Sequence, residues 1–160
     1  MIDILGTLDE KIELNNKIIE KNNHILKTNF SSFYAKIKAT SKCYKIGTLD
    51  IIVADFVANG SFASLKQNVE ILEKPSFAYF IRNADLKVGT FNKYVSEITY
   101  KFLAKSALYG NEVLISNVGD VGSVFLCPIL DKPMTLGNNM IYLTSKADKP
   151  YLNFYLYFFF

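Results

Sequence analysis

An apolar repeat at the start of the chain predicts a long helix with one interacting face. The repeat alternates spacings of three and four residues through Leu5, Leu8, Ile12, Asn15, Ile19, Asn22 and Leu26. This is the a/d pattern of a coiled coil, in which such residues form a seam against a partner helix. No Pro or Gly interrupts residues 8–27, so the helix can run through them without a break. The alternative is that this apolar face packs on the chain's own domain.

The two Asn residues in the repeat indicate a seam that selects its partner. A buried amide weakens helix pairing but fixes the register, because only an in-register polar group satisfies it. Thr7 and Glu10 have the spacing of a capping box, which predicts that the helix begins there. Apolar residues continue at helical spacing to residue 37, which predicts about 30 residues and roughly 45 Å of helix. We expect the helix to end at residues 39–41.

The rest of the chain changes to the pattern of β-strands. Five strands are predicted where β-branched and aromatic residues gather, at residues 49–57, 77–81, 112–116, 121–126 and 139–144. Residues 85–91 look irregular around Gly89, and residues 99–104 fit either a short helix or a strand. Asp148 and Pro150 suit the start of a closing helix over residues 151–160. The predicted fold class is α+β: a long N-terminal coiled-coil-type helix, then a mixed, strand-rich domain with a C-terminal helix.

Composition fits one globular domain plus the helix. The chain has 160 residues, 50% of them hydrophobic, and a net charge of +3, so it can bury a core but is only mildly basic. Its start has no apolar signal segment, and the longest apolar run, residues 154–160, is too short to cross a bilayer. We therefore expect a cytoplasmic protein with no membrane contact.

The chain lacks the residue groupings that catalysis or metal binding requires. Its single histidine, His24, falls on the predicted helix, and its two cysteines, Cys43 and Cys127, are far apart in the sequence. No imidazole is then available for acid–base chemistry in the domain, and neither a zinc site nor a disulfide framework is indicated. We expect no metal, no catalytic residue and no cofactor in this chain, and a binding protein rather than an enzyme.

Two polar segments are candidates for contact with nucleic acid. The first, residues 116–122, contains Asn117, Gly119 and Gly122 between two predicted strands. Glycine lets backbone amides approach a phosphate oxygen, so this loop could clamp a nucleic-acid backbone, although a plain hairpin turn fits equally well. The second, residues 59–68, offers hydrogen-bonding groups that can read base edges in the major groove. We select Ser61, Ser64 and Lys66 from it.

Basic residues supply the remaining candidates. Lys36, Lys38 and Lys42 lie in a stretch free of acids, whereas Lys87 and Lys93 lie further on with Arg82, the only arginine. The planar fork of Arg82 suits guanine or phosphate, and it suits a carboxylate such as Asp85 equally well. Ordinary solvated surface is the alternative for each lysine.

Several segments resemble type I restriction-modification specificity subunits. Residues 5–18, LGTLDEKIELNNKI, look like the opening of the conserved spacer helix of that family, and residues 30–33 resemble its aromatic end. Residues 44–49 are similar to the entry strand of a target-recognition domain. The strand and glycine turn at residues 111–122, residues 136–141 and the aromatic run from Tyr151 extend the likeness over nearly the whole chain.

The resemblance implies a DNA-reading role for two parts of the chain. Residues 1–40 would be the spacer helix and residues 41–160 a target-recognition domain truncated at its C-terminal end. In that family two such domains, held apart by antiparallel helices, read a split target in double-stranded DNA. Methyltransferase and restriction subunits do the chemistry and bind S-adenosylmethionine and ATP. This chain corresponds to half of such a subunit and would need a second half, or a second copy, as its helix partner.

A function of a different class also fits the sequence. A coiled-coil arm joined to a β-rich domain can serve as an oligomerisation or adaptor protein that binds a protein or a glycan and no nucleic acid. The two hypotheses differ in their response to salt, because phosphate contacts release counterions and an adaptor makes none.

Overall fold

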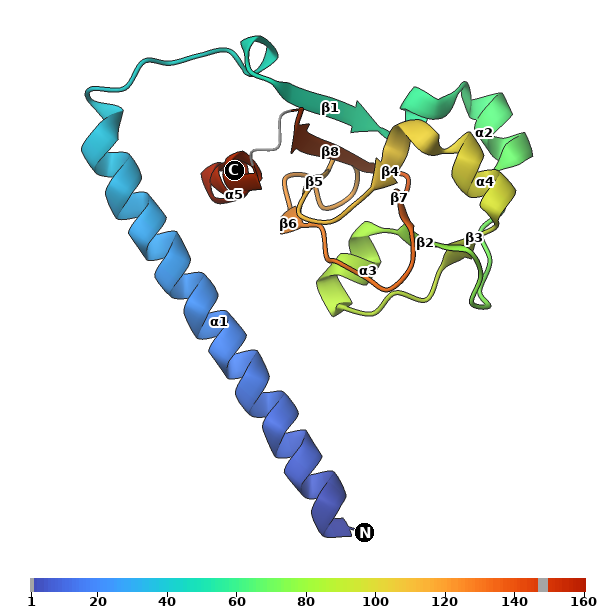
Figure 1. The fold of residues 1–160 in the computed structure, drawn as a ribbon, viewed down its shortest axis with the longest axis horizontal. Coiled ribbons are helices and arrows are strands. Elements are labelled where there is room, and N and C mark those ends of the chain that lie inside the picture. Colours follow the sequence, from blue (N-terminus) through green and yellow to red (C-terminus); the bar gives the residue numbers. More distant parts are fainter. Residues whose placement is uncertain (1, 147–149) are drawn as a thin grey trace. The chain divides into compact units, whose positions relative to one another are not determined.

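The computed structural model describes residues 2–146 and 150–160, and it divides into two compact units. The helical unit comprises residues Met1–Tyr44, and the strand-rich unit comprises residues Lys45–Phe160. The fold is α+β, with a long N-terminal helix, a strand-rich region and a C-terminal helix, as the sequence predicts (Figure 1). No helix among the described residues has the length and apolar character needed to cross a membrane.

The helical unit is dominated by α1, which spans Ile2–Lys38 without interruption. With 37 residues it is about 55 Å long, so the predicted length was too short. The predicted start was also wrong, because Thr7 lies inside the helix rather than at its cap. Gly6 costs a helix only about 1 kcal/mol, which does not stop the backbone from continuing through it. The helix ends where the amides of Thr40 and Ser41 both donate to the Ile37 carbonyl, at 3.0 and 2.9 Å.

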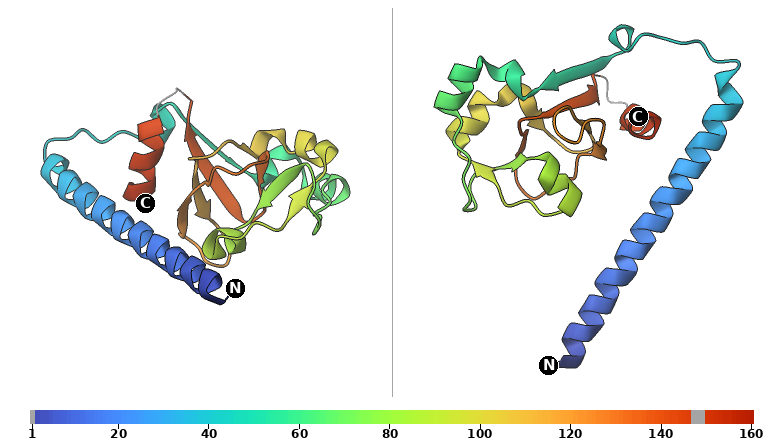
Figure 2. Two further views of the ribbon diagram at one scale, coloured as in Figure 1. Left: turned by 60° about the horizontal axis from the view of Figure 1, so that its bottom comes forward. Right: turned by 180° about the vertical axis from the view of Figure 1, so that it is seen from behind.

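One sheet of the strand-rich unit contains, in spatial order, β1 (Ile51–Asp55), β8 (Met140–Ser145), β5 (Val113–Ser116) and β6 (Val124–Leu126). Every neighbouring pair is antiparallel. Helix α5 (Pro150–Phe159) lies beside this sheet (Figure 2). Leu156 of α5 is buried in one cluster with Leu143 of β8. The Ser145 amide donates to Asn153 Oδ1 at 3.0 Å and fixes α5 against the end of β8.

The second sheet contains β3 (Tyr94–Val95), β2 (Ala78–Ile81), β7 (Met134–Leu136) and β4 (Ala107–Leu108), in that order. Its central pair, β2 and β7, is parallel. The buried side chains of Leu65, Phe80 and Leu103 pack together beside this sheet. They join it to α2 (Phe62–Asn68) and α4 (Glu97–Phe102). Helix α3 (Asn83–Val88) follows β2, and the described residues of the unit also form the 3₁₀ turns η1 (Ile46–Thr48), η2 (Phe56–Asn59) and η3 (Ala104–Ser106).

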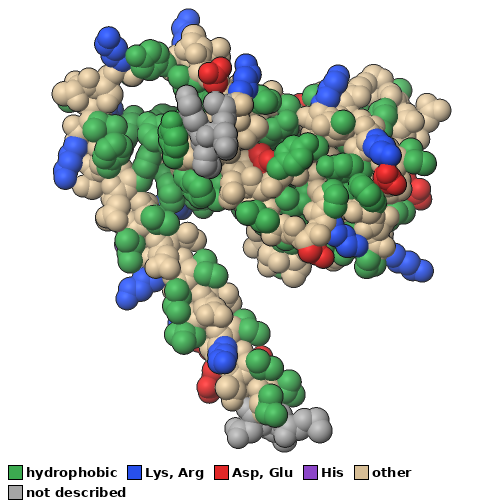
Figure 3. Space-filling view, viewed as in Figure 1, with side chains coloured by type: hydrophobic (Ala, Val, Ile, Leu, Met, Phe, Trp, Pro, Cys, Tyr) green, Lys and Arg blue, Asp and Glu red, His purple; other side chains and the backbone are tan. Residues whose placement is uncertain are grey.

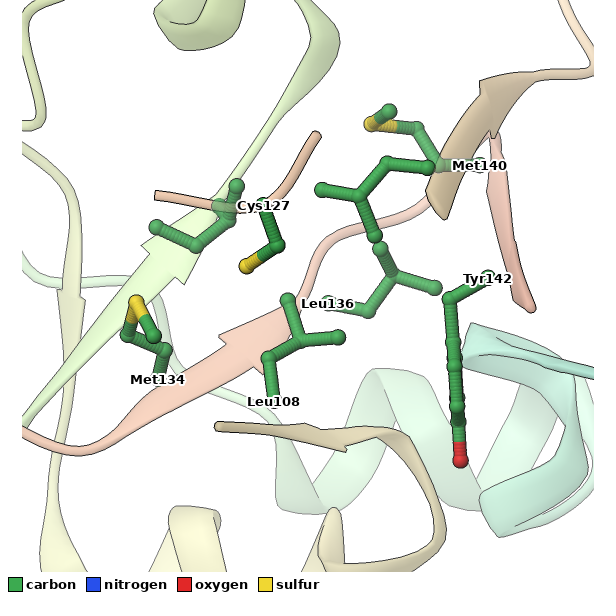
Figure 4. Close-up of a cluster of buried hydrophobic side chains, with 8 residues drawn as sticks. Leu108, Cys127, Met134, Leu136, Met140 and Tyr142 are labelled. Atoms are coloured by element: carbon green, nitrogen blue, oxygen red, sulfur yellow. The ribbon is translucent and has the colours of Figure 1, made fainter. Parts of the chain in front are cut away.

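A single buried cluster joins the two sheets. Leu108 and Leu136 from the second sheet pack with Met140 and Tyr142 from the first, and Cys127 fills the space beside them (Figure 4). Dense packing of this kind makes the two sheets one body. The position of the loops between their strands is therefore set by the core.

The observed helices and strands agree in part with those predicted from the sequence. Each of the five predicted strand segments contains a strand. β1 occupies residues 51–55 of the predicted segment 49–57, which continues as η2, and β8 runs one residue beyond the predicted end at residue 144. Residues 99–104 lie largely in α4. The irregular segment predicted at residues 85–91 was wrong, because α3 begins at Asn83 and Gly89 ends it with a φ of 75°. Strands β3, β4 and β7 were not predicted, since two or three residues carry no periodicity. The predicted Asp148 cap lies outside the described residues.

We predict that the two cysteines differ sharply in reactivity. Cys127 is 2% exposed, and burial, followed by the nearby Glu112 carboxylate, raises the pKa of its thiol, so thiolate is scarce. Cys43 is exposed. Iodoacetamide at neutral pH should therefore alkylate Cys43 in the native protein and Cys127 only after unfolding in urea, as measured by intact-mass spectrometry. Similar labelling rates for both thiols in the native protein would contradict this packing of the core.

Candidate nucleic-acid interface

A cavity of about 420 Å³ brings together the two polar segments that the sequence predicted as contacts for nucleic acid. It lies within the strand-rich unit, between η2, α2, the β5–β6 loop and the β7–β8 turn. Its lining residues are Asp55, Phe56, Val57, Phe62, Leu65, Lys66, Val69, Ile71, Phe80, Asn117, Val118, Asn138, Asn139 and Met140. The first segment contributes Asn117, and the second contributes Lys66.

Helix α2 forms one wall of the cavity because its two ends and its inner face are fixed. The Ser61 hydroxyl accepts a hydrogen bond from the Ser64 amide at 3.3 Å, which caps the helix. Leu65 is buried beneath it. Phe62 and Lys66 are four residues apart and so lie on one side of the helix. The polar segment 59–68 is thus mostly helix, and Ser61 and Ser64 hold the backbone rather than line the cavity.

The adjoining turn η2 is fixed by Asn59. The Asn59 side-chain amide donates to the Ser106 hydroxyl at 2.8 Å, and its oxygen accepts from the Lys105 amide at 2.9 Å. Asp55 caps the same turn by accepting from the Ala58 amide at 2.8 Å. These bonds hold Phe56 and Val57 in position as part of the cavity wall.

The glycine loop between β5 and β6 is a hairpin turn, which was one of its two interpretations. Gly119 and Gly122 have φ values of 80° and 89°, a region that favours glycine. The Gly122 amide donates to the Ser116 carbonyl at 2.9 Å, and the Asn117 amide donates to the Asn139 carbonyl at 3.1 Å. These two amides are committed to the protein, so a phosphate clamp through them would have to break both bonds.

The predicted residue Lys87 pairs with this loop. Its ammonium lies 2.5 Å from Asp120 Oδ2. This contact and a hydrogen bond from the Ser123 hydroxyl lower the pKa of the Asp120 carboxyl. Lys87 is therefore paired with an acidic side chain beside the loop.

The β7–β8 turn supplies two amides that sequence reasoning missed as contacts, Asn138 and Asn139. With Asn117 they place three exposed carboxamides along the lining of the cavity. Asn139 has a φ of 66°, which Asn tolerates better than most residues. The available signal was the Gly-Asn-Asn sequence between two apolar strands, which is typical of a tight turn.

Two other predicted residues, Arg82 and Lys93, also form ion pairs with acidic side chains. Arg82 donates through Nε to Asp85 Oδ2 at 2.8 Å and through a terminal nitrogen to Asp85 Oδ1 at 2.6 Å. This hydrogen bond raises the pKa of the Arg82 guanidinium. Lys93 lies 2.5 Å from Glu73 Oε1 and lowers the pKa of that carboxyl. The carboxylate alternative weighed for Arg82 is therefore the arrangement found, and reading of guanine would require release of Asp85.

The helical unit contains the remaining candidates. Lys36 and Lys38 lie in the last turn of α1 and Lys42 follows it, all exposed. All seven seam residues, Leu5, Leu8, Ile12, Asn15, Ile19, Asn22 and Leu26, are exposed as well. The apolar face is broader than the seam, because Ile4, Ile18 and Ile25 lie one position before Leu5, Ile19 and Leu26 and are also exposed. Figure 3 shows hydrophobic side chains at the surface along the helix. A face of this width is typical of a helix within a bundle.

Neither a family model nor a curated protein matches the chain. Within the described residues, no group of three His, Cys, Asp or Glu side chains is placed to hold a metal ion.

We predict that Arg82 acts mainly on stability. Asp85 is 4% exposed, so Arg82→Ala leaves a buried carboxylate without its cation and should lower the free energy of unfolding by about 1–3 kcal/mol. Lys101→Ala is the matched control, because the Lys101–Glu97 pair is well exposed and should contribute less than about 0.5 kcal/mol. Urea denaturation followed by circular dichroism measures both. Loss of DNA specificity without loss of stability would instead assign Arg82 to base reading.

Proposed function

We propose that the chain is a DNA-specificity component, similar to half of a type I restriction-modification specificity subunit. The strand-rich unit reads one part of a split target in double-stranded DNA. The exposed face of α1 pairs with a second half or a second copy. Methyltransferase and restriction subunits carry out modification and cleavage, and S-adenosylmethionine and ATP bind to them. We expect such a complex in the cytoplasm, where it has access to chromosomal DNA.

One observation carries this proposal: two segments predicted to contact nucleic acid, separated by some fifty residues, line the same cavity. Lys66 brings a free-standing cation to it, and Asn117 brings a carboxamide. An ammonium group positions a phosphate, whereas a carboxamide can pair with adenine through two hydrogen bonds. The three Asn side chains and Lys66 therefore supply both kinds of contact that sequence-specific DNA binding uses.

The length of α1 supports the second element of the proposal. A continuous helix of 37 residues extends about 55 Å, which equals roughly 16 base pairs at 3.4 Å each. A rigid helix of this length can set the gap between two half-sites. Exposure of this many Leu and Ile side chains to water is unfavourable, and pairing with a second helix would bury them.

The rival hypothesis, a coiled-coil adaptor that binds no nucleic acid, is favoured by the low net charge. Lys87 and Lys93 are paired with acids, which leaves fewer cations for phosphate than the sequence suggested. Even a few phosphate contacts make the affinity for DNA fall as the salt concentration rises, whereas an adaptor binds no DNA at any salt concentration.

We predict that the chain binds duplex DNA with a logarithmic affinity that falls linearly with the logarithm of salt concentration. Lys66→Gln should reduce the magnitude of that slope by about 1, because it removes one phosphate contact. Lys101→Gln is the control, since Lys101 is exposed but does not line the cavity. Fluorescence anisotropy at several salt concentrations measures each slope. Absence of DNA retention even at low salt would support the adaptor and overturn the proposal.

We also predict that the seam amides select the helix partner. Replacing Asn15 and Asn22 by Leu should strengthen self-association by on the order of 1 kcal/mol per amide, because each change puts an apolar side chain where a polar one would be buried between the helices. The same change should let the helix accept partners or orientations that the native seam rejects. Sedimentation velocity measures association, and pull-down between differently tagged variants measures selectivity.

The matched control adds two leucines on the opposite side of the same helix. Lys17→Leu with His24→Leu gives a similar gain of apolar surface away from the seam and should leave association as it is. Unchanged association in the Asn variant would mean that Asn15 and Asn22 are not part of a seam.

A further inference from the structure

We propose that the cavity binds one nucleobase that has been turned out of the DNA stack. This inference rests on the proposed function and adds to it the class of ligand that the site accepts. The first observation is the shape of the cavity. Reading base edges within the major groove calls for a helix or ribbon that protrudes into the groove, whereas this site is concave, with a volume of about 420 Å³. That volume is within the range of small-molecule sites, so the ligand must enter the protein.

The walls of the cavity suit a flat aromatic ring. Leu65, Phe80 and Met140 are buried and form its apolar part. Phe56 meets Phe80 edge to face, with 5.9 Å between ring centroids. Phe62 also lines the cavity and is 78% exposed. An exposed aromatic side chain on the edge of an apolar site offers a surface on which a base can stack.

The polar lining suits the edge of a base rather than a purely apolar ligand. Asn117, Asn138 and Asn139 each carry a donor and an acceptor on one side chain, and all three are exposed at the lining of the cavity. Bases present donors and acceptors in the plane of the ring, which carboxamides can match. An apolar side chain from a protein partner would use none of these groups.

The charges of the lining separate the base from its phosphate. Asp55 is partly buried and lines the cavity, whereas Lys66 lines it and is exposed. A carboxylate at the lining disfavours an anionic group there, so the phosphate of a ligand is expected to stay outside while an uncharged base can enter. The exposed Lys66 can hold the attached phosphate outside. A neutral ring joined to an external phosphate is the chemistry of a nucleotide.

A duplex with a single unpaired base provides the test, because the energy of unpairing has already been spent. Three duplexes of one sequence are compared by fluorescence anisotropy: fully paired, with a central mismatch, and with abasic sites on both strands at the same position. The mismatched duplex should bind at least about fivefold more tightly than the paired duplex. The abasic duplex should lack that gain. Equal gain with the abasic duplex would mean that DNA flexibility is recognised, and it would overturn the proposal.

Two variants of one loop connect the effect to the cavity. Val118→Trp places a large ring at a residue that lines the cavity, and it should remove the preference for the mismatched duplex over the paired duplex. Val121→Trp is the matched control, because Val121 is exposed in the same loop but does not line the cavity, and it should keep the preference. Preference retained by Val118→Trp would place the unpaired base elsewhere and overturn the inference.

Free nucleotides test whether the cavity takes its base from DNA or from a nucleoside monophosphate. Adenosine, guanosine, cytidine and thymidine monophosphates should bind more weakly than the mismatched duplex, since they lack the contacts of the flanking strand. Tighter binding of a free monophosphate that Val118→Trp abolishes would make the cavity a nucleotide site and overturn the DNA version. Loss of all duplex binding by the native chain would overturn the proposed function as well, whereas paired-duplex binding without any mismatch preference overturns only the present inference.

Discussion

The hydrogen bond from the Gly137 amide to the Ile81 carbonyl, at 2.7 Å, determines where the site is built. It extends the parallel pairing of β2 and β7 to the point where the chain turns into β8. A Cβ atom at residue 137 would lie 2.7 Å from the same carbonyl oxygen, so only glycine permits this approach. Because β7 and β8 belong to different sheets, the turn between them carries Asn138 and Asn139 across the junction between the two sheets. The cavity is therefore a consequence of how the sheets meet.

Polar bonds in the interior keep the other walls in place. Ser106 and Thr135 exchange a hydrogen bond at 3.3 Å while both are buried, and Ser106 also accepts from Asn59. This connection joins η2, η3 and β7, elements that no single stretch of sequence contains. A cavity supported in this way can keep its shape without a ligand, which lowers the cost of binding.

The helical and strand-rich units are stabilised by different means. The strand-rich unit buries clusters that combine both sheets and α5, whereas the seam of α1 exposes its Leu and Ile side chains. Stability of a helix in proteins comes mainly from packing of its apolar face. Under the proposed function, pairing of α1 and reading of DNA are thus separate tasks, and each can be altered by substitutions that leave the other intact.

The sequence by itself determined the α+β class, the long helix and most strands, because apolar periodicity of 3.6 or two residues depends only on neighbours along the chain. It also drew attention to Lys66 and Asn117 as polar residues within candidate segments. The sequence left Asp85 open as one partner of Arg82, and the folded chain pairs the two. Tertiary structure alone decided that Lys66 and Asn117 share a cavity with Asn138 and Asn139, and that Lys87 and Lys93 are held by Asp120 and Glu73. Such contacts join residues distant in sequence or depend on side-chain geometry, and no local pattern records which charges meet once the sheets pack.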